Sequence, residues 1–338
     1  MFRRIWVPAL FCLFMAAVAL GAERPTITGL VFGDYYWIAG HHNPDIEGRN
    51  GFWFRRIYLT LDQQFTKQLE VRLRFEMNSP GDFSSATKLE PFVKDAYLKY
   101  RFGHHAVYLG LSPTPTWDVI EKFWGYRPVE KTPLDLQKFG SSRDFGIALK
   151  GSLDRSKKWR YHLMIGNGSG VRGETNEGKI FLLSLGFYPD EHVFVEIYGD
   201  YDDRPGSSDR YTFQGFLGLK GSWGRVGLHY AHQTRQIEDG DDLQLDIASI
   251  FTVLKLSDNV YVFSRYDRVF DPNPDGAKIA YLPFDPTTRS NFIVAGVDFH
   301  VVENVRLIPN IEIVFYDQQA GERPDTDVVP RLTFTYIF

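Results

Sequence analysis

The sequence predicts an all-β protein, a transmembrane antiparallel β-barrel of about 16 strands, and three observations support this fold class. Apolar and polar residues alternate along many segments, short and long connections alternate between those segments, and the chain ends on an alternating strand that closes with Phe338. The composition agrees, because 16% aromatic residues and 30 glycines suit strands and tight turns better than packed helices.

The first 22 residues have the pattern of an export signal and not of a folded element. Arg3 and Arg4 precede an almost wholly apolar run over residues 5–20, which ends in small residues. A membrane anchor is the alternative, but an internal proline interrupts the run and no basic flank follows it. We therefore expect a signal peptide over residues 1–22 and a single barrel domain over residues 23–338.

The strand prediction rests on a period of two in hydropathy. Between residues 69 and 77 every odd position is apolar and every even position is charged, which is the pattern of a strand with one face in an apolar environment. Segments of this kind recur near residues 27–38, 52–63, 68–77, 92–101, 105–111, 143–151, 159–166, 179–187, 192–201, 209–220, 224–233, 243–254, 260–268, 290–300, 305–316 and 328–338. Sixteen is an even number, as in bacterial single-chain barrels.

The connections separate into two classes that alternate along the chain. Connections after even-numbered segments are short, such as 64–67 and 102–104, whereas those after odd-numbered segments are mostly long and polar, such as 39–51 and 112–142. Outer-membrane barrels have short periplasmic turns on one rim and long extracellular loops on the other. A soluble β-sandwich also alternates in hydropathy, but it has no reason to sort its loops in this way.

The last strand carries a further signal. Tyr336 and the terminal Phe338 alternate with polar residues and resemble the C-terminal signal read by the barrel-assembly machinery. Aromatic residues at strand ends would form the girdles at the membrane interfaces, and we expect Trp53, Trp159, Phe187 and Tyr211 in these positions.

The residues that face away from lipid predict the function. Charges on that face need water or a partner, and sixteen strands leave an aqueous channel, so a diffusion pore for small hydrophilic solutes is expected. The predicted pore-lining residues are Arg56, Arg72, Arg74, Lys99, Arg101, Lys150, Arg160, Glu70, Glu76 and Asp95. Their basic excess favours anions weakly. The alternative is that these charges pair across neighbouring strands and only stiffen the wall.

The longest connection, residues 112–142, is the predicted constriction. It contains a short helical pattern over residues 116–124, for which Thr116 would be the N-cap. If the segment folds inward, its charged residues would narrow the pore. These candidates are Asp118, Glu121, Lys122, Arg127, Glu130 and Lys131. The alternative is a loop packed over the mouth or against a neighbouring subunit.

Several strands carry recognisable motifs. These are Phe54-Arg55-Arg56-Ile57-Tyr58-Leu59-Thr60-Leu61, residues 69–77, Val93-Lys94-Asp95-Ala96-Tyr97-Leu98-Lys99-Tyr100, and Arg265-Tyr266-Asp267-Arg268 with Asp271-Pro272-Asn273. In this order the chain resembles the phosphate-selective porin O and P family over most of its length. The resemblance implies a trimeric, sixteen-stranded outer-membrane porin that conducts anions such as phosphate. The chain departs from the family at residues 110–115, which lack the family's lysine.

Other function classes lack support in the sequence. The formal charge of -4 argues against nucleic acid as a partner, and the sole cysteine lies in the predicted signal peptide. No catalytic residues, metal ligands or cofactor site follow from the spacing of histidines and serines, so we expect a protein that is not an enzyme. The expected partners are outer-membrane lipid, small solutes or inorganic anions, the barrel-assembly machinery and two further copies in a homotrimer.

Two further functions remain open. A sugar-specific channel would use aromatic side chains that face inward, for which Tyr58, Tyr97, Tyr198 and Tyr316 are candidates. A plugged barrel with a structural or adhesive role would be favoured if inward-facing phenylalanines such as Phe194 and Phe216 closed the lumen.

Overall fold

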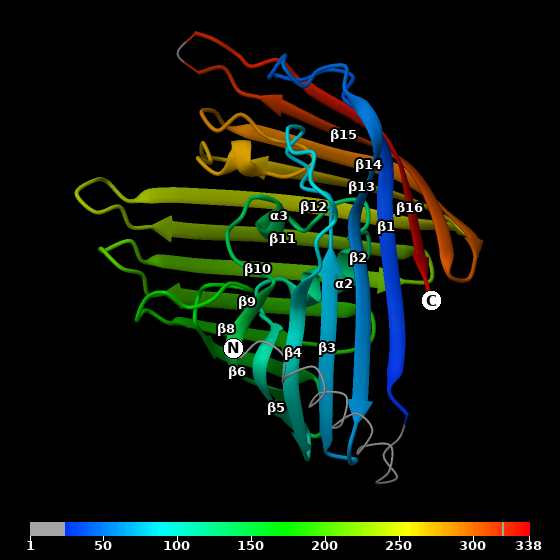
Figure 1. Ribbon diagram of the computed structural model, residues 1–338, viewed down its shortest axis with the longest axis vertical. Coiled ribbons are helices and arrows are strands. Elements are labelled where there is room, and N and C mark those ends of the chain that lie inside the picture. The colour runs from blue at the N-terminus through cyan, green and yellow to red at the C-terminus, as the bar shows by residue number, and fades with distance from the viewer. Residues whose placement is uncertain (1–23, 320) are drawn as a thin grey trace, which may run out of the picture.

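A computed structural model describes residues 24–319 and 321–338, and it is a closed antiparallel barrel of sixteen strands (Figure 1). The strands are β1 (Thr26–Trp37), β2 (Asn50–Gln64), β3 (Leu69–Met77), β4 (Phe92–Phe102), β5 (His105–Pro113), β6 (Arg143–Ser152), β7 (Trp159–Gly166), β8 (Ile180–Phe187), β9 (Val193–Asp202), β10 (Arg210–Gly221), β11 (Gly224–Arg235), β12 (Leu243–Ser257), β13 (Val260–Val269), β14 (Ser290–Val302), β15 (Val305–Tyr316) and β16 (Asp327–Ile337). The predicted fold class is confirmed. The predicted signal peptide lies outside the described residues.

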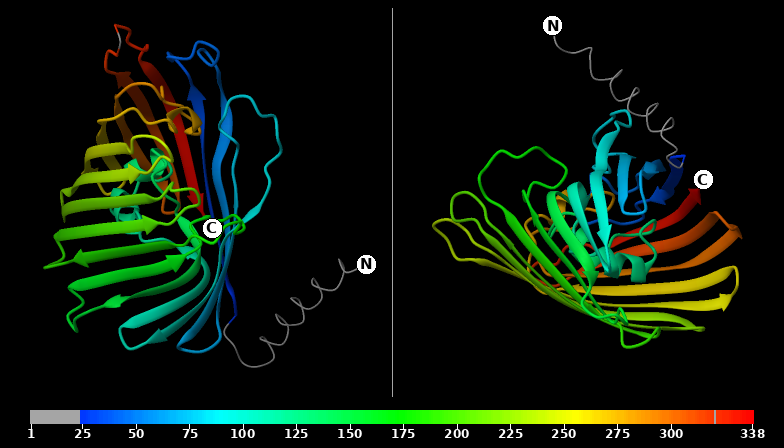
Figure 2. Two further views of the ribbon diagram at one scale, coloured as in Figure 1. Left: turned by 90° about the vertical axis from the view of Figure 1, so that its left-hand side faces the viewer. Right: turned by 90° about the horizontal axis from the view of Figure 1, so that it is seen from below.

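Each strand pairs with its neighbours in sequence, and β1 closes the sheet by pairing with β16 (Figure 2). The closing register places Leu30 opposite Ile337 and Tyr36 opposite Arg331. Closure satisfies the backbone hydrogen bonds of every strand and leaves no sheet edge, which is the condition for spanning a bilayer with strands. Among the described residues no helix is long and apolar enough to cross a membrane.

The connections divide between the two rims as the sequence predicts. One rim carries short turns, such as 65–68, 103–104 and 222–223, and is called here the short-turn rim. The opposite rim carries longer loops, such as 38–49, 78–91 and 270–289, and is called here the long-loop rim.

The outer face of the barrel is apolar. Leu109, Ile147 and Leu163 are exposed on the successive strands β5, β6 and β7, because no protein covers this face. Tyr336 of β16 and Phe338, which follows this strand, are also exposed, and the backbone of Phe338 forms hydrogen bonds of 2.7 and 3.0 Å with Gly29 of β1. The last residue therefore belongs to the closing seam, and its role as an assembly signal remains a prediction.

A β-bulge in β2 changes which side chains face inward. The register with β1 shifts between Phe32 and Gly33, and one extra residue is inserted in β2 at Arg55 and Arg56. As a result both arginines contact interior groups. Trp53 also turns inward, where its indole nitrogen donates to Asp34 at 3.1 Å. The prediction that Trp53 belongs to an interface girdle was therefore wrong, because it assumed uninterrupted alternation.

Candidate functional site: the barrel interior

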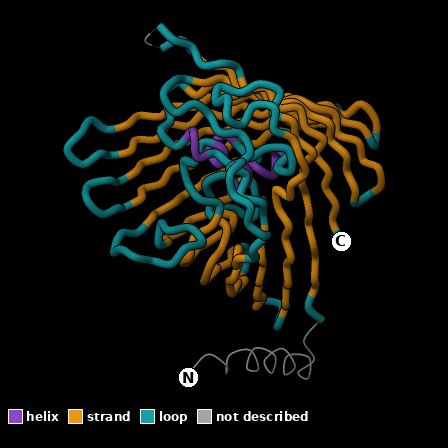
Figure 3. Tube along the Cα trace, turned by 45° about the horizontal axis from the view of Figure 1, so that its top comes forward, coloured by secondary structure: helices purple, strands orange, loops and turns teal. Residues whose placement is uncertain are grey.

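Residues 114–142, called here the inner loop, connect β5 to β6 and fold into the barrel (Figure 3). Three wall side chains hold its backbone by donating to carbonyl oxygens. Gln214 of β10 donates to Thr116 at 2.6 Å, Gln233 of β11 donates to Phe139 at 2.6 Å, and Arg265 of β13 donates to Lys131 at 2.5 Å. The loop therefore crosses the interior, and it does not pack over the mouth.

The inner loop contains two short helices, α2 (Asp118–Trp124) and α3 (Pro133–Leu136). The helical pattern near residues 116–124 is confirmed for α2, but the predicted N-cap was wrong. The N-cap residue is Trp117, and no side chain caps the helix. The hydroxyl of Thr116 instead contacts Tyr198 of β9 at 3.0 Å, because Thr116 lies one residue too early and against the wall.

Apolar packing fixes the inner loop against strands β9 to β16. Most of its buried apolar side chains form one cluster with inward-facing residues of these strands, and Trp117, Leu134 and Phe139 belong to a second cluster on β11 to β13. The first cluster includes Ile120, Trp124, Tyr126, Val129 and Leu136 from the loop, and Phe194, Phe216, Phe251, Phe263, Phe292, Val294 and Val314 from the wall. Full burial of a large apolar side chain contributes about 1.5–3 kcal/mol. This part of the interior is therefore a protein core and not a water-filled space.

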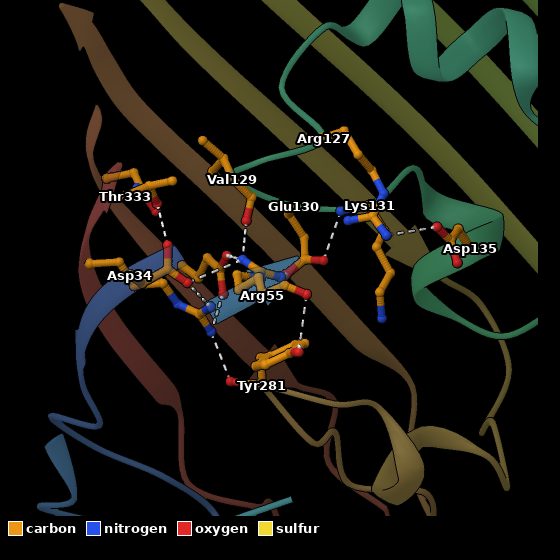
Figure 4. A network of polar contacts seen from close by, with 12 residues as sticks. Asp34, Arg55, Arg127, Val129, Glu130, Lys131, Asp135, Tyr281 and Thr333 are labelled. Carbon is orange, nitrogen blue, oxygen red and sulfur yellow. Dashed lines mark hydrogen bonds and ion pairs between the residues drawn. The ribbon is translucent and has the colours of Figure 1, made fainter. Parts of the chain in front are cut away.

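An ion pair clamps the inner loop to β2 (Figure 4). The buried Arg55 guanidinium lies 2.7 Å from the Glu130 carboxylate and also donates to the carbonyl oxygen of Val129. Asp34 and Glu312 lie 3.7 and 3.8 Å from the same guanidinium. A charge buried this deeply needs such partners, because removal from water without them costs several kcal/mol. The bulge in β2 is what brings Arg55 to this position.

Two neighbouring loop residues have pKa values that burial and charge displace from the ordinary ones. Burial alone would raise the pKa of Glu130, but Arg55 and Lys131 hold it below its usual range. Burial lowers the pKa of Lys131 to about 8, although Asp135 and Glu130 oppose that change. Glu130 therefore stays charged at neutral pH, whereas Lys131 loses its proton at a pH only slightly above neutral.

The six predicted constriction residues divide into two groups. Asp118 pairs with Lys122 at 2.9 Å, and Glu121 pairs with Arg127 at 3.1 Å. These four line the open cavities beside the loop. By contrast, Glu130 and Lys131 are buried, and Glu130 serves as an anchor for the loop.

The predicted pore-lining charges of β2 to β4 all point inward and are paired with one another. The ion pairs are Arg72–Asp62 at 2.7 Å, Arg56–Glu76 at 2.8 Å, Arg74–Asp95 at 3.5 Å, Lys99–Glu70 at 3.5 Å, and Arg101–Glu70. This arrangement corresponds to the alternative in which the charges pair across strands. Lys150 and Arg160 differ, since neither forms an ion pair within the described part of the chain. They lie over the rings of Tyr108 and Tyr188, at 4.9 and 4.1 Å.

Two cavities lie between the inner loop and the wall. The larger, about 1170 Å³, extends from α2 to the short-turn rim along β6 to β10. Its charged lining comprises seven cations and four carboxylates: Lys122, Lys150, Lys157, Lys158, Arg160, Lys220 and Arg225, and Asp118, Asp190, Glu191 and Glu196. The smaller, about 240 Å³, lies beside β1 to β4 and has four cations, Arg74, Lys94, Arg127 and Arg143, and two carboxylates, Glu121 and Asp135.

Sequence reasoning missed Arg55 and Lys94, which strict alternation places on the lipid face. A second bulge, in β4, turns Lys94 inward to within 3.0 Å of Glu76. A charged residue at a lipid-facing position is costly, so each adjacent charged pair, Arg55-Arg56 and Lys94-Asp95, was a usable signal for a bulge. Arg143 and Arg225 were also missed, and the sequence offered no comparable signal for them.

No protein-family model matches the chain, and no curated protein matches it in sequence. Solved structures match its fold. An anion-selective porin from Comamonas acidovorans has a TM-score of 0.69 at 11% identity, covering 93% of this chain and 99% of that one. OmpF of Salmonella typhi, solved with daunomycin, has a TM-score of 0.68 at 10% sequence identity, and the match covers 93% of this chain and 97% of OmpF. OmpT of Vibrio cholerae has a TM-score of 0.67 at 11% sequence identity, and the match covers 93% of this chain and 97% of OmpT. The chain thus has the fold of outer-membrane porins, and the resemblance to the O and P family finds no match.

Proposed function

We propose that the protein is an outer-membrane porin, a water-filled channel for small hydrophilic solutes with a mild preference for anions. One observation carries the proposal: an open, strongly charged space remains beside the inner loop and reaches the short-turn rim. A cavity lined by this many charged groups is filled with water, because the groups that lack partners need hydration.

The anion preference follows from the charges that are left unpaired. On the wall of β2 to β4 the cations outnumber the four carboxylates, but each lies within 3.5 Å of one, and Glu70 and Glu76 each pair with two. The paired cations are Arg56, Arg72, Arg74, Lys94, Lys99 and Arg101. The larger cavity has seven cations against four carboxylates, and neither Lys150 nor Arg160 lies within ion-pair distance of a carboxylate among the described residues. A cleft with an excess of one sign raises the local concentration of the opposite ion. The preference therefore arises near β6, β7 and β10, and not at the paired residues Arg72 and Arg74.

The assembly that we propose is a homotrimer. One of the structures with the same fold is the trimer form of OmpT from Vibrio cholerae, with a TM-score of 0.64 at 11% identity. Phosphate-like anions belong to the proposed solute range, but no group in the cavities singles out phosphate from other small anions.

The sugar-channel alternative is weaker. Its aromatic candidates do not line one path, because the Tyr198 hydroxyl contacts Thr116 of the inner loop and the Tyr316 hydroxyl contacts Asp327. Both rings are buried. The second alternative is a plugged barrel, and the apolar packing of the inner loop is the observation in its favour. Conduction measurements distinguish a plugged barrel from a pore.

Swelling of proteoliposomes tests the pore itself. Liposomes that contain the refolded protein are diluted into isotonic solutions of small neutral solutes of increasing size, with liposomes that contain heat-denatured protein as the control. We expect rapid swelling that slows as the solute grows. Swelling no faster than the control for the smallest solutes would reject the pore and favour the plugged barrel.

A further inference from the structure

Three metal-binding side chains meet at the long-loop rim, although they come from opposite ends of the chain. His41 and His42 lie in the loop after β1, and Asp327 is the first residue of β16. One ligand atom from each lies within 4.8 Å of the other two. The histidine spacing alone gave no metal site because the third group becomes a neighbour only when β1 pairs with β16.

The distances within this triad suit a small metal ion. The Nδ1 atom of His42 lies 2.9 Å from Oδ1 of Asp327, and Nδ1 of His41 lies 3.8 Å from the same oxygen. Ligands at about 2.0–2.1 Å from a tetrahedral zinc ion are separated from each other by about 3.3 Å. The observed separations lie on either side of this value, so small side-chain rotations bring the three atoms to one ion.

The carboxylate is oriented as metal ligands usually are. The hydroxyl of Tyr316 donates to Oδ2 of Asp327 at 2.5 Å, and the backbone N–H of Asp285 donates to the Tyr316 oxygen at 3.1 Å. This chain of hydrogen bonds holds Oδ2, while Oδ1 lies toward both imidazoles and also accepts the backbone N–H of His42 at 2.7 Å. Such outer partners fix the geometry of the atoms that bind the ion.

The two imidazoles differ in how readily they offer a lone pair. Nδ1 of His42 lies 2.9 and 3.1 Å from the two Asp327 oxygens, so it donates its N–H to that carboxylate and releases this proton when a metal ion binds. The N–H of Asn43 donates to Nδ1 of His41 at 2.9 Å, so this nitrogen is unprotonated and its lone pair is available. Asn43 is exposed, and water can therefore replace that hydrogen bond when an ion binds.

We propose that His41, His42 and Asp327 form a binding site for a divalent transition-metal ion of the zinc type at the long-loop rim. Two imidazoles and one carboxylate are ligands for zinc, copper or nickel and not for calcium or magnesium, which prefer oxygen. Three protein ligands leave one position for water. The ion joins the loop after β1 to the start of β16 and stiffens the mouth of the barrel at its closing seam. The site does not depend on the proposed channel function.

Zinc itself is the probe. Untagged, refolded full-length protein is freed of metal with a chelator and titrated with Zn²⁺ by calorimetry, with Mg²⁺ as a parallel titrant. We expect one Zn²⁺ per chain for the wild type and no comparable binding of Mg²⁺. His42→Ala and Asp327→Asn each remove one ligand and are expected to weaken Zn²⁺ binding by more than about tenfold.

A matched control removes two histidines from the opposite rim. His104 and His105 are also adjacent in sequence, but they lie at the short turn between β4 and β5 with no third ligand among the described residues. The double variant His104→Ala/His105→Ala should bind Zn²⁺ as the wild type does. The shifted migration of the folded barrel in unboiled gels shows that each variant has folded. Asp327→Asn keeps the side-chain shape in case His42→Ala does not fold.

Two further readouts separate this site from weak surface binding. Co²⁺ in place of Zn²⁺ should give the visible absorption of a four-coordinate site in the wild type and not in Asp327→Asn. Zn²⁺ should also raise the unfolding temperature of the wild type and of the histidine control, because a ligand that binds only the folded state stabilises it. Zn²⁺ binding that is absent from the wild type, or equal in Asp327→Asn, would overturn the proposal.

Discussion

At the scale of single residues, Arg55 shows how one bulge brings a charged side chain into the barrel interior, where it pairs with the inner loop. Without Arg55, the buried Glu130 loses its ion-pair partner, while Arg331 still faces Asp34 and Glu312 at 3.3 and 2.9 Å. Because removing one partner of a buried ion pair leaves charge uncompensated, we expect Arg55→Ala to lower the free energy of unfolding by about 3–5 kcal/mol. Urea unfolding followed by tryptophan fluorescence measures this loss.

The control for this prediction is Arg72→Ala. Arg72 also faces a carboxylate, Asp62, but both side chains are about one quarter exposed. Pairs with this exposure contribute about 1 kcal/mol or less. Equal losses in the two variants would mean that the Arg55 cluster does not anchor the inner loop.

Lys131 predicts a pH dependence with a definite sign. Its pKa is lowered by burial to about 8 in the folded state, below the ordinary lysine value near 10.4. The unfolded chain then binds more protons than the folded one between these values, so stability rises with pH. From pH 7 to pH 9 the gain is roughly 1 kcal/mol.

The variant Lys131→Met tests this assignment. It removes the ammonium group and keeps the backbone carbonyl that Arg265 requires. The charged groups around Lys131 are Arg56, Arg127, Asp135 and Glu130. We therefore expect the rise in stability between pH 7 and 9 to disappear in the variant. A rise of the same size in both proteins would assign it to another group.

At the scale of elements, the inner loop is held mainly by apolar packing, and Trp124 is central to it. Its ring is fully buried, and its indole nitrogen donates to the carbonyl oxygen of Glu130 at 3.0 Å. Truncating a buried tryptophan to alanine typically costs about 3–5 kcal/mol. We expect Trp124→Ala to show this loss, together with larger fluctuations of single-channel current, because the loop is less firmly held.

Trp159→Ala is the control for Trp124→Ala. Trp159 starts β7 on the outer face and is about half exposed. Its removal should leave the current fluctuations at the wild-type level. If the single-channel current fluctuates equally in both variants, the inner loop does not determine the stability of the open channel.

The elements differ in how far the sequence predicts them. The strands follow from a local period of two, since each outward-facing position must be apolar by itself. The path of the inner loop depends on partners far away in sequence, such as Gln214, Gln233 and Arg265, and no local pattern contains that information. The bulges in β2 and β4 are partly predictable from the sequence, because strict alternation would place a charged residue at a lipid-facing position there.

At the scale of the whole molecule, the barrel has two unlike halves. Strands β9 to β16 pack against the inner loop as a core, whereas the open space lies toward β1 to β10. The sequence predicted the barrel and the inward charges of β2 to β4. It left open whether these charges pair across strands, because pairing depends on register between strands. Within the described part of the chain, cations that form no ion pair, such as Lys150 and Arg160, lie in the larger cavity.

The reversal potential in a planar bilayer under a KCl gradient tests the central claim most directly. We predict stepwise conductance with a chloride-preferring potential for the wild type. The triple variant Lys150→Gln/Arg160→Gln/Lys220→Gln should shift that potential toward cations. The control triple Lys67→Gln/Lys88→Gln/Arg172→Gln, which removes as much charge from exposed turns and loops, should leave it unchanged. A cation-preferring potential for the wild type, or equal potentials for the wild type and the variant Lys150→Gln/Arg160→Gln/Lys220→Gln, would contradict the account.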